Sequence, residues 1–241
     1  GSKTRLFNGL ANLTAAAFYT KYKNQQLNEV IGTTGFIRSA PGSTIKGIEL
    51  EFDWKPYPSG RINGYVTWTD ARVTEDWITK WDYDPEYLFG LSYEESIDPE
   101  NDMLTTNLKG NQLAMVPKYT ANLSYTHSFD LGSYGFIHGW FNVSWKDKSY
   151  NTIWNVDRHL DDMDFAVSDE AVGYIDDRRD AHTIANASLK YEPVGQVWFA
   201  EFFVSNATDE TVQQWSNTGK GFPKGSFNMP RYYGVRAGFN F

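Results

Sequence analysis

The feature that most constrains the fold of this chain is an alternation of apolar and polar residues with a period of two. In the clearest segment, Ile48, Leu50 and Trp54 occupy even positions, and Glu49 and Glu51 occupy odd positions. Successive side chains of a β-strand point to opposite faces, so this spacing predicts strands with one apolar and one polar face. The pattern predicts eight strands, near 10–23, 48–54, 61–73, 119–126, 135–146, 183–191, 197–206 and 233–241, and a short ninth strand at 3–7.

The links between these strands alternate between short and long. Compact turns that contain Gly, Pro or Asn lie at 8–9, 55–60, 130–133 and 192–196, and long links cover 24–44, 74–117, 147–179 and 207–230. An antiparallel meander with short periplasmic turns and long external loops is the layout of outer-membrane barrels. A soluble β-sandwich is the alternative, but it gives no reason for this rhythm and rarely has a loop as long as 74–117. We therefore expect an all-β, antiparallel transmembrane β-barrel.

The composition agrees with this expectation. The chain contains 9 Trp, 15 Tyr and 16 Phe, yet its mean hydropathy is negative. No run approaches the roughly 20 apolar residues that a transmembrane helix needs, so a spanning chain has to satisfy its backbone groups within a closed barrel. The net charge of −8 argues against binding to nucleic acid. Because there is no Cys, disulfides and thiol chemistry are excluded.

Five segments resemble, in order and spacing, the C-terminal half of TonB-dependent outer-membrane receptors. They lie at 13–24, 46–51, 110–119, 204–210 and 230–235, and the fourth is close to the Asn-Leu-Thr-Asp motif of that family. The resemblance implies a barrel of 22 strands, plugged by an N-terminal globular domain. Residues 1–241 would then supply the last eight or nine strands, without the plug domain and without the energy-coupling box.

The resemblance also implies a function and a set of partners. Such a receptor takes up a scarce nutrient across the outer membrane of a Gram-negative bacterium, most often a ferric siderophore, with an oligosaccharide or cobalamin as alternative substrates. It performs no chemistry, so we expect neither enzymatic activity nor a cofactor. The implied partners are the plug and the earlier strands, the TonB complex, the barrel assembly machinery, lipopolysaccharide and outer-membrane lipids.

Aromatic side chains on the long links are the candidate ligand-binding residues. In the link 74–117 they lie beside carboxylates such as Glu75 and Asp76. Flat rings can stack on a sugar or a chelate, and carboxylates can accept its hydrogen bonds. A loop that packs its own aromatics is the alternative. The candidates are Trp77, Trp81, Tyr83, Tyr87, Trp154, Arg158, His159 and Trp215.

The acidic link 147–179 was considered as a metal site, and Asp180 and His182 as a catalytic pair. The acidic residues lack the spacing of an EF-hand, and a single His is too few for a transition-metal site. We predict no metal site, but a solvated surface bridged by divalent ions to lipopolysaccharide. Asp180 and His182 leave open a small, self-contained barrel that acts as an omptin-like protease or an adhesin. No Gly-x-Ser-x-Gly or His-Glu-x-x-His motif accompanies them.

The last predicted strand ends in alternating aromatics. Terminal rings anchor a strand at the boundary between water and lipid, and this strand resembles the signal that the barrel assembly machinery reads. Charged residues such as Glu49, Glu51, Asp53, Lys190 and Arg236 are expected on the face directed into the barrel. The residues of the expected assembly signal are Tyr233, Val235, Phe239 and Phe241.

Overall fold

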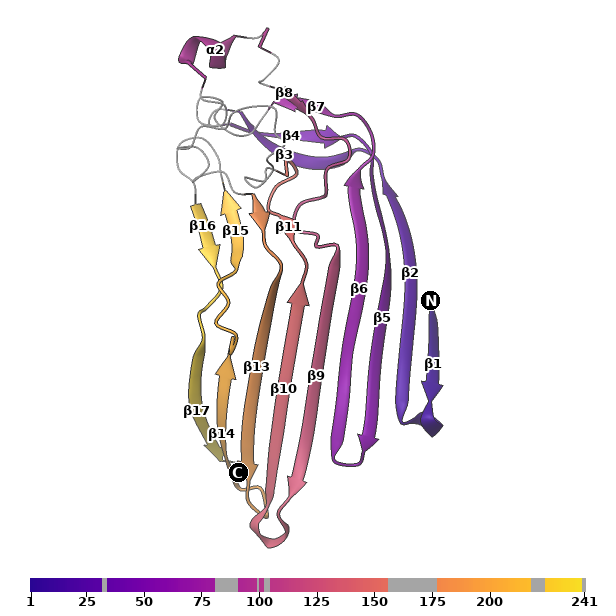
Figure 1. The fold of residues 1–241 in the computed structure, drawn as a ribbon, viewed down its shortest axis with the longest axis vertical. Helices are drawn as coiled ribbons and strands as arrows, with labels where there is room; N and C mark the ends of the chain where they lie inside the picture. Colours follow the sequence, from indigo (N-terminus) through magenta and orange to yellow (C-terminus); the bar gives the residue numbers. More distant parts are fainter. Residues whose placement is uncertain are drawn as a thin grey trace.

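The computed structural model describes residues 1–31, 34–80, 91–98, 100–101, 105–155, 177–217 and 224–239. Within these residues, nine strands form one antiparallel sheet in the order β1-β2-β5-β6-β9-β10-β13-β14-β17. Each of these strands lies beside the one that precedes it along the chain, which makes the sheet an up-and-down meander (Figure 1). The predicted all-β, antiparallel fold is confirmed.

All eight predicted strands and the short ninth one are present. The alternation of 48–54 marked only the middle of its strand, because the polar Ser43 and Thr44 and the small Gly47 obscure the pattern towards its start. The strands of the sheet are β1 (Ser2–Leu6), β2 (Ala11–Tyr22), β5 (Ser43–Tyr57), β6 (Gly60–Val73), β9 (Tyr119–Asp130), β10 (Phe136–Lys146), β13 (His182–Glu192), β14 (Trp198–Ser205) and β17 (Tyr232–Phe239).

The two ends of the sheet differ as the link lengths predicted. Compact turns, two of which contain the short helical turns η1 (Phe7–Gly9) and η3 (Gly132–Tyr134), join the strands at one end. The other end carries short hairpins and the helix α2 (Tyr93–Ile97), none of which was predicted (Figure 1). The hairpins are β3 (Gln25–Ile31) with β4 (Thr34–Ala40), β7 (Ile78–Lys80) with β8 (Thr105–Asn107), β11 (Ser149–Tyr150) with β12 (Arg178–Arg179), and β15 (Gln213–Asn217) with β16 (Lys224–Phe227). No helix among the described residues is long and apolar enough to cross a membrane.

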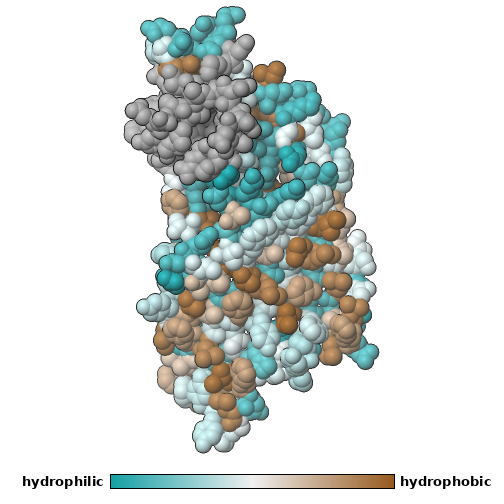
Figure 2. Space-filling view, viewed as in Figure 1, coloured by the Kyte–Doolittle hydropathy of each residue, from teal (hydrophilic) through white to brown (hydrophobic). Residues whose placement is uncertain are grey.

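The strand register sorts the side chains into an apolar and a polar face. Leu50 lies opposite Ala15 on one neighbouring strand and Val66 on the other, and the same row continues through Ala121 and Trp145. We call the face that carries this row the apolar face. Figure 2 shows apolar side chains gathered over the lower part of the strands and hydrophilic ones towards the loop end.

The opposite face, the polar face, carries a continuous row of hydrogen-bonding side chains. Neighbouring amides on this face contact each other, as when Asn142 Nδ2 donates to Asn122 Oδ1 at 3.1 Å. Arg61 also forms an ion pair with Asp53 on the same face. The row crosses six strands through Asn12, Asp53, Asn63, Ser124, Asn142 and Asn186.

Four phenylalanine rings each lie over a glycine directly opposite on the neighbouring strand. A Cβ atom added to Gly47 would lie 2.5 Å from Phe18 Cζ, and one added to Gly234 would lie 2.9 Å from Phe203 Cζ. An aromatic ring that covers a cross-strand glycine fixes the register of the two strands. The pairs are Phe18–Gly47, Phe52–Gly64, Phe199–Gly238 and Phe203–Gly234.

A small apolar core lies at the loop end of the polar face. Ala71 and Val73 of β6 are 2% and 3% exposed, and they pack with the loop residue Leu113. Ile45, Val116 and Ile153 pack around these three residues. The segments that follow β8 and β10 are therefore held against the sheet.

Candidate functional site

The candidate ligand-binding residues that the structure describes lie at the loop end of the sheet. Of the eight, Trp77, Trp154 and Trp215 are within the described residues. Trp81, Tyr83, Tyr87, Arg158 and His159 lie outside the described residues. Trp215 on β15 is 48% exposed, whereas Trp77 and Trp154 are half-buried.

Trp77 lies at the base of the β7–β8 hairpin. Its main-chain N–H donates to Asn107 Oδ1 at 3.0 Å, and its carbonyl accepts from the N–H of Leu108 at 2.9 Å. Asp76 beside it accepts from Lys109 Nζ and from Asn107 Nδ2, each at 2.9 Å. The hydrogen bond from Lys109 and then that from Asn107 lower the pKa of Asp76 below its ordinary value.

The loop that carries Trp154 is bonded to the preceding loop. Asn111 Nδ2 donates to the carbonyls of Ile153 and Trp154 at 3.0 and 3.1 Å. In return, Asn155 Oδ1 accepts from the N–H of Gln112 at 2.7 Å, and Asn155 Nδ2 donates to the carbonyl of Gln112. Two side-chain amides thus join two loops that are about forty residues apart in the sequence.

A buried carboxylate fixes the other end of the Trp154 loop. Asp177 is completely buried, and its carboxylate accepts hydrogen bonds from the N–H of Thr152 at 2.8 Å and from the Thr152 hydroxyl. Its carbonyl accepts from the N–H of Asn151 at 2.8 Å. Asn151 in turn donates to Gln213 Oε1 at 2.8 Å, which reaches the β15–β16 hairpin that carries Trp215.

Arg179 connects three loops at one point. Its Nη2 atom donates to Asn151 Oδ1 at 3.1 Å and to the carbonyl of Gln214 at 2.6 Å, and it lies 3.4 Å from Met115 Sδ. Burial lowers the pKa of this guanidinium from its ordinary value. We call the set Asn111, Asn151, Thr152, Asn155, Asp177, Arg179 and Gln213 the loop anchor. The loop anchor was not predicted from the sequence, because the residues that bond to one another in it lie far apart along the chain.

Asp180 and His182, the candidate catalytic pair, have other partners, and residues 156–176 of the acidic link weighed as a metal site lie outside the described residues. The Asp180 carboxylate accepts from Arg178 Nε at 2.9 Å, and His182 Nδ1 lies 3.0 Å from the main-chain carbonyl of Asp180. They line a pocket of about 280 Å³ together with Arg179, Glu210 and Phe227, but the carboxylate does not orient the imidazole as a general-base pair requires. Within the part of the chain that the structure describes, no group of three or more His, Asp or Glu residues could hold a metal ion.

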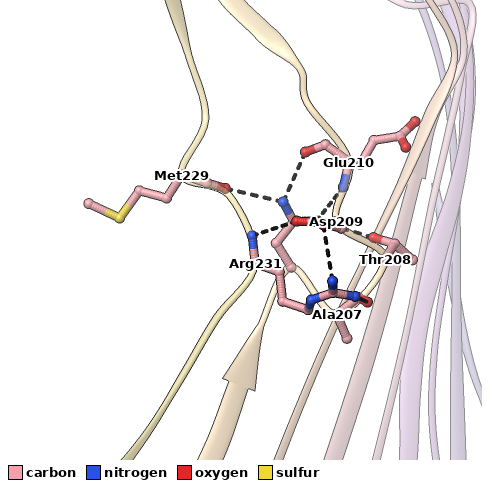
Figure 3. Close-up of polar contacts among 7 residues, drawn as sticks. Ala207, Thr208, Asp209, Glu210, Met229 and Arg231 are labelled. Atoms are coloured by element: carbon pink, nitrogen blue, oxygen red, sulfur yellow. Dashed lines mark hydrogen bonds and ion pairs between the residues drawn. The ribbon is translucent and has the colours of Figure 1, made fainter.

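The Asn-Ala-Thr-Asp segment at 206–209 closes the base of the β15–β16 hairpin (Figure 3). Asn206 is 4% exposed, and its Nδ2 atom donates to the carbonyls of Glu210 and Met229 at 2.9 and 3.1 Å. Its Oδ1 atom accepts from the N–H of Glu210 at 3.0 Å and from the Thr208 hydroxyl at 3.2 Å. One side chain therefore holds the end of β14 against the start of β17.

The residues of the expected assembly signal lie on the edge strand β17. Tyr233, Val235 and Phe239 are 73%, 74% and 72% exposed and alternate along one face. Phe241 lies outside the described residues. Nothing in this geometry tests recognition by the assembly machinery, so that role stays a prediction.

Comparison with solved structures shows that the sheet has the architecture of outer-membrane receptor barrels. The ferric yersiniabactin uptake receptor FyuA from Yersinia pestis superposes with a TM-score of 0.67 at 19% identity, over 99% of this chain and 29% of that one. The ferric preacinetobactin receptor BauA from Acinetobacter baumannii gives 0.58 at 16% identity, over 98% and 27%. The ferric citrate transporter FecA in its unliganded form gives 0.59 at 15% identity, over 95% and 29%. The chain thus spans less than a third of each of these proteins.

The sequence itself identifies the family. The model of the TonB dependent receptor-like β-barrel matches residues 1–216, and a comparison with curated protein sequences gives no significant match. The fold defines a wall segment of an outer-membrane-type β-barrel. The chain belongs to the TonB-dependent receptor β-barrel family, whose members are transporters rather than enzymes. The predicted resemblance is confirmed, and the protease alternative is not supported.

Proposed function

We propose that residues 1–241 form the C-terminal part of the barrel wall of a TonB-dependent transporter that imports a scarce nutrient, a ferric siderophore in the first instance. The observation that carries the proposal is the family match over residues 1–216 together with the nine-stranded meander. The three compared proteins are a ferric yersiniabactin receptor, a ferric preacinetobactin receptor and a ferric citrate transporter. Uptake of ferric chelates is therefore the first activity to test.

The strand directions support the presence of further strands in the complete wall. Strands alternate in direction, so β1 and β17, the first and ninth strands of the sheet, point the same way (Figure 1). If these two edges met directly, they would pair in parallel, whereas bacterial single-chain barrels are antiparallel throughout and have an even number of strands. Closure of an antiparallel barrel from this sheet requires an odd number of added strands. The 13 strands that separate nine from about 22 satisfy this condition.

The polar face is suited to line the interior of such a barrel. Its row of Asn and Ser side chains offers hydrogen bonds to water or to a plug domain at little electrostatic cost. We assign the apolar face to lipid, and the plug, the earlier strands, the TonB complex and the barrel assembly machinery to the partners of the complete receptor. The outer membrane of a Gram-negative bacterium is the corresponding location.

The lipid-facing assignment is tested by paired substitutions in the complete receptor. Leu50→Arg places a charge near the middle of the apolar band and costs about 2–4 kcal/mol if that band contacts lipid. Glu51→Gln, on the polar face next to it, serves as the matched control. We expect less folded receptor in the outer membrane for Leu50→Arg alone, measured as heat-modifiable migration on a gel. Equal effects of the two substitutions would contradict the assignment.

The transport activity is tested by growth under iron limitation. A strain that lacks the receptor gene is supplied with ferric siderophores of the catecholate, hydroxamate and carboxylate classes, and oligosaccharide and cobalamin uptake are measured in parallel. We expect one ferric chelate to restore growth only when the complete receptor and a functional TonB complex are both present. Growth that depends on an oligosaccharide or on cobalamin would replace the substrate class and keep the transporter. Uptake independent of TonB would overturn the proposal.

A further inference from the structure

The apolar face changes character at the loop end of β2, β5 and β6. Four successive rows of cross-strand neighbours describe the change from apolar side chains, through aromatic ones, to charged ones. The rows are Ala15–Leu50–Val66, Ala17–Ile48–Trp68, Tyr19–Lys46–Asp70 and Lys21–Thr44–Arg72. The last two rows bring three cations to one place on a face that is otherwise apolar.

The three cations outnumber the carboxylate that lies among them. Lys46 Nζ is 3.4 Å from Asp70 Oδ2, and Arg72 Nε donates to Asp70 Oδ1 at 2.7 Å. Arg72 Nη1 also donates to the carbonyl of Gly110 at 2.9 Å, which fixes the guanidinium. Lys21 is exposed, and among the described residues it has no ion-pair partner. This patch is therefore cationic in a chain whose net charge is −8.

The cations lie where an apolar band of membrane thickness would end. Ten residues separate Trp54, near the short-turn end of β5, from Thr44, which lies in the row of Lys21 and Arg72. This separation is about 33 Å along the strand, or about 25 Å in height at the tilt of roughly 40° that barrel strands have. Outer-membrane barrels have an apolar band about 25 Å tall, flanked by aromatic residues at both interfaces. Tyr19 lies opposite Lys46, and Trp68 lies one row nearer the apolar band, opposite Ile48, as interfacial aromatics do.

We propose that Lys21, Lys46 and Arg72 form a binding site for the phosphate group of a phosphorylated lipid in the outer leaflet of the membrane. The lipid's acyl chains would run along the rows that contain Ile48 and Leu50. Lysine supplies compact point charges, and the guanidinium fork of Arg72, fixed by Asp70 and Gly110, matches the geometry of phosphate oxygens. The site rests on the proposed placement of the sheet in the outer membrane, and it deepens that proposal by naming a lipid partner.

The test uses the complete receptor, purified from outer membranes in detergent and analysed by native mass spectrometry. The probes are diphosphoryl lipid A, the same lipid with its phosphates removed, and inorganic phosphate. We expect diphosphoryl lipid A to remain bound, the dephosphorylated lipid to bind at least tenfold more weakly, and millimolar inorganic phosphate not to displace the lipid. Equal binding of both lipids would overturn the site, and displacement by inorganic phosphate would identify a free anion as its ligand and overturn the lipid assignment.

Matched variants locate the site on the receptor. A cation near an anionic lipid surface contributes about fivefold in affinity, so Lys21→Gln with Lys46→Gln should raise the Kd for diphosphoryl lipid A about tenfold or more. Lys3→Gln with Lys55→Gln changes the net charge equally but lies away from the patch, and it should leave the Kd unchanged. Asp70→Asn removes the carboxylate that contacts Lys46 and Arg72 and should lower the Kd. Unchanged affinity in the first double variant would overturn the proposal.

Fractionation separates failure of this site from failure of the proposed function. A receptor that is absent from the outer membrane fraction overturns the membrane placement and, with it, the lipid site. A receptor that is present, supports nutrient uptake and binds both lipids equally overturns the lipid site alone. The single variant Lys21→Gln, which removes no described contact, provides the same comparison if the double variant does not fold.

Discussion

The carboxylate of Asp209 accepts two hydrogen bonds from Arg231, one from the main-chain N–H at 3.0 Å and one from the guanidinium at 3.1 Å. The pair joins the two stems of the β15–β16 hairpin (Figure 3), which the buried Asn206 also joins through its hydrogen bonds to Glu210 and Met229. Both side chains are 49% exposed. An ion pair this exposed contributes about 0–1 kcal/mol. The buried amide of Asn206 therefore stabilises the base of the hairpin more than the Asp209–Arg231 pair does.

Asn206→Ala should therefore destabilise the receptor more than Asp209→Asn does. The first substitution removes the four hydrogen bonds of an amide that is only 4% exposed, each of which contributes about 0.5–1.5 kcal/mol, although Asn228 Nδ2 still donates to the Glu210 carbonyl. The second removes only the charge of an exposed pair. Urea unfolding of the complete receptor in lipid bilayers measures both changes, with Thr211→Ala, at an exposed neighbouring position, as the control. The reverse order of effects would contradict the assignment of Asn206 as the main fastening.

Arg179→Ala should loosen three loops together. The guanidinium is bonded to Asn151, to the carbonyl of Gln214 and to Met115, so its loss removes contacts to all three loops at once. Hydrogen exchange should become faster for amides at 149–152 and at 213–215, while the amides of β10 keep their protection. Lys148→Ala, at an exposed cation in the same loop, is the control. Faster exchange limited to the neighbours of residue 179 would show that the loops are independent.

The base of the β7–β8 hairpin should weaken in acid. The folded-state pKa of Asp76 is lowered by its hydrogen bonds from Lys109 and then Asn107, relative to an ordinary value of 3.8. A lowered pKa means that the stabilisation is fully present above the ordinary value and is lost as the pH falls through the folded-state pKa. Hydrogen exchange at 77–80 should accelerate below about pH 4 in the native receptor. In Asp76→Asn the exchange should not depend on pH in this window beyond the intrinsic chemical rate; the same acceleration in that variant would assign the effect to another group.

Gly64→Ala should be more harmful than Gly139→Ala, although both glycines lie in the middle of strands. A Cβ atom at Gly64 would collide with the Asn122 carbonyl and lie 3.0 Å from the Phe52 ring, whereas at Gly139 the nearest atoms are 3.9 and 4.0 Å away. Overpacking of this kind costs about 1–3 kcal/mol. Unfolding in lipid bilayers should show that difference, and equal stabilities would mean that the Phe52 ring moves freely.

The strands were predictable from sequence because period two is a local signal. The number of strands and the alternation of short and long links followed from residues a few positions apart. The short hairpins at the loop end were not predictable, because pairs such as Ile78 with Asn107 join segments that lie about thirty residues apart. The strands β7, β8, β11 and β12 have only two or three residues, which is too short to show a period.

The candidate site was predictable only in part, for the same reason. An aromatic residue in a long link can be recognised as a binding candidate from the sequence alone, and Trp77, Trp154 and Trp215 all lie at the loop end as expected. A residue such as Asp177 does not reveal its role, because a buried carboxylate and a solvated one look alike in sequence. The bond from Asn151 to Gln213 spans 62 positions and depends on the register of β10, β13 and β14. The Phe–Gly pairs likewise emerge only when that register is known.

The loop anchor also sets where this receptor can be engineered. Among the described residues, its contacts reach Asn155 on one side of the Trp154 loop and Asp177 on the other. A peptide tag or a transplanted binding segment placed between those two residues leaves all seven residues of the anchor unchanged. New recognition sequences can thus be exchanged at one position of the chain while the residues that bond the loops together are kept.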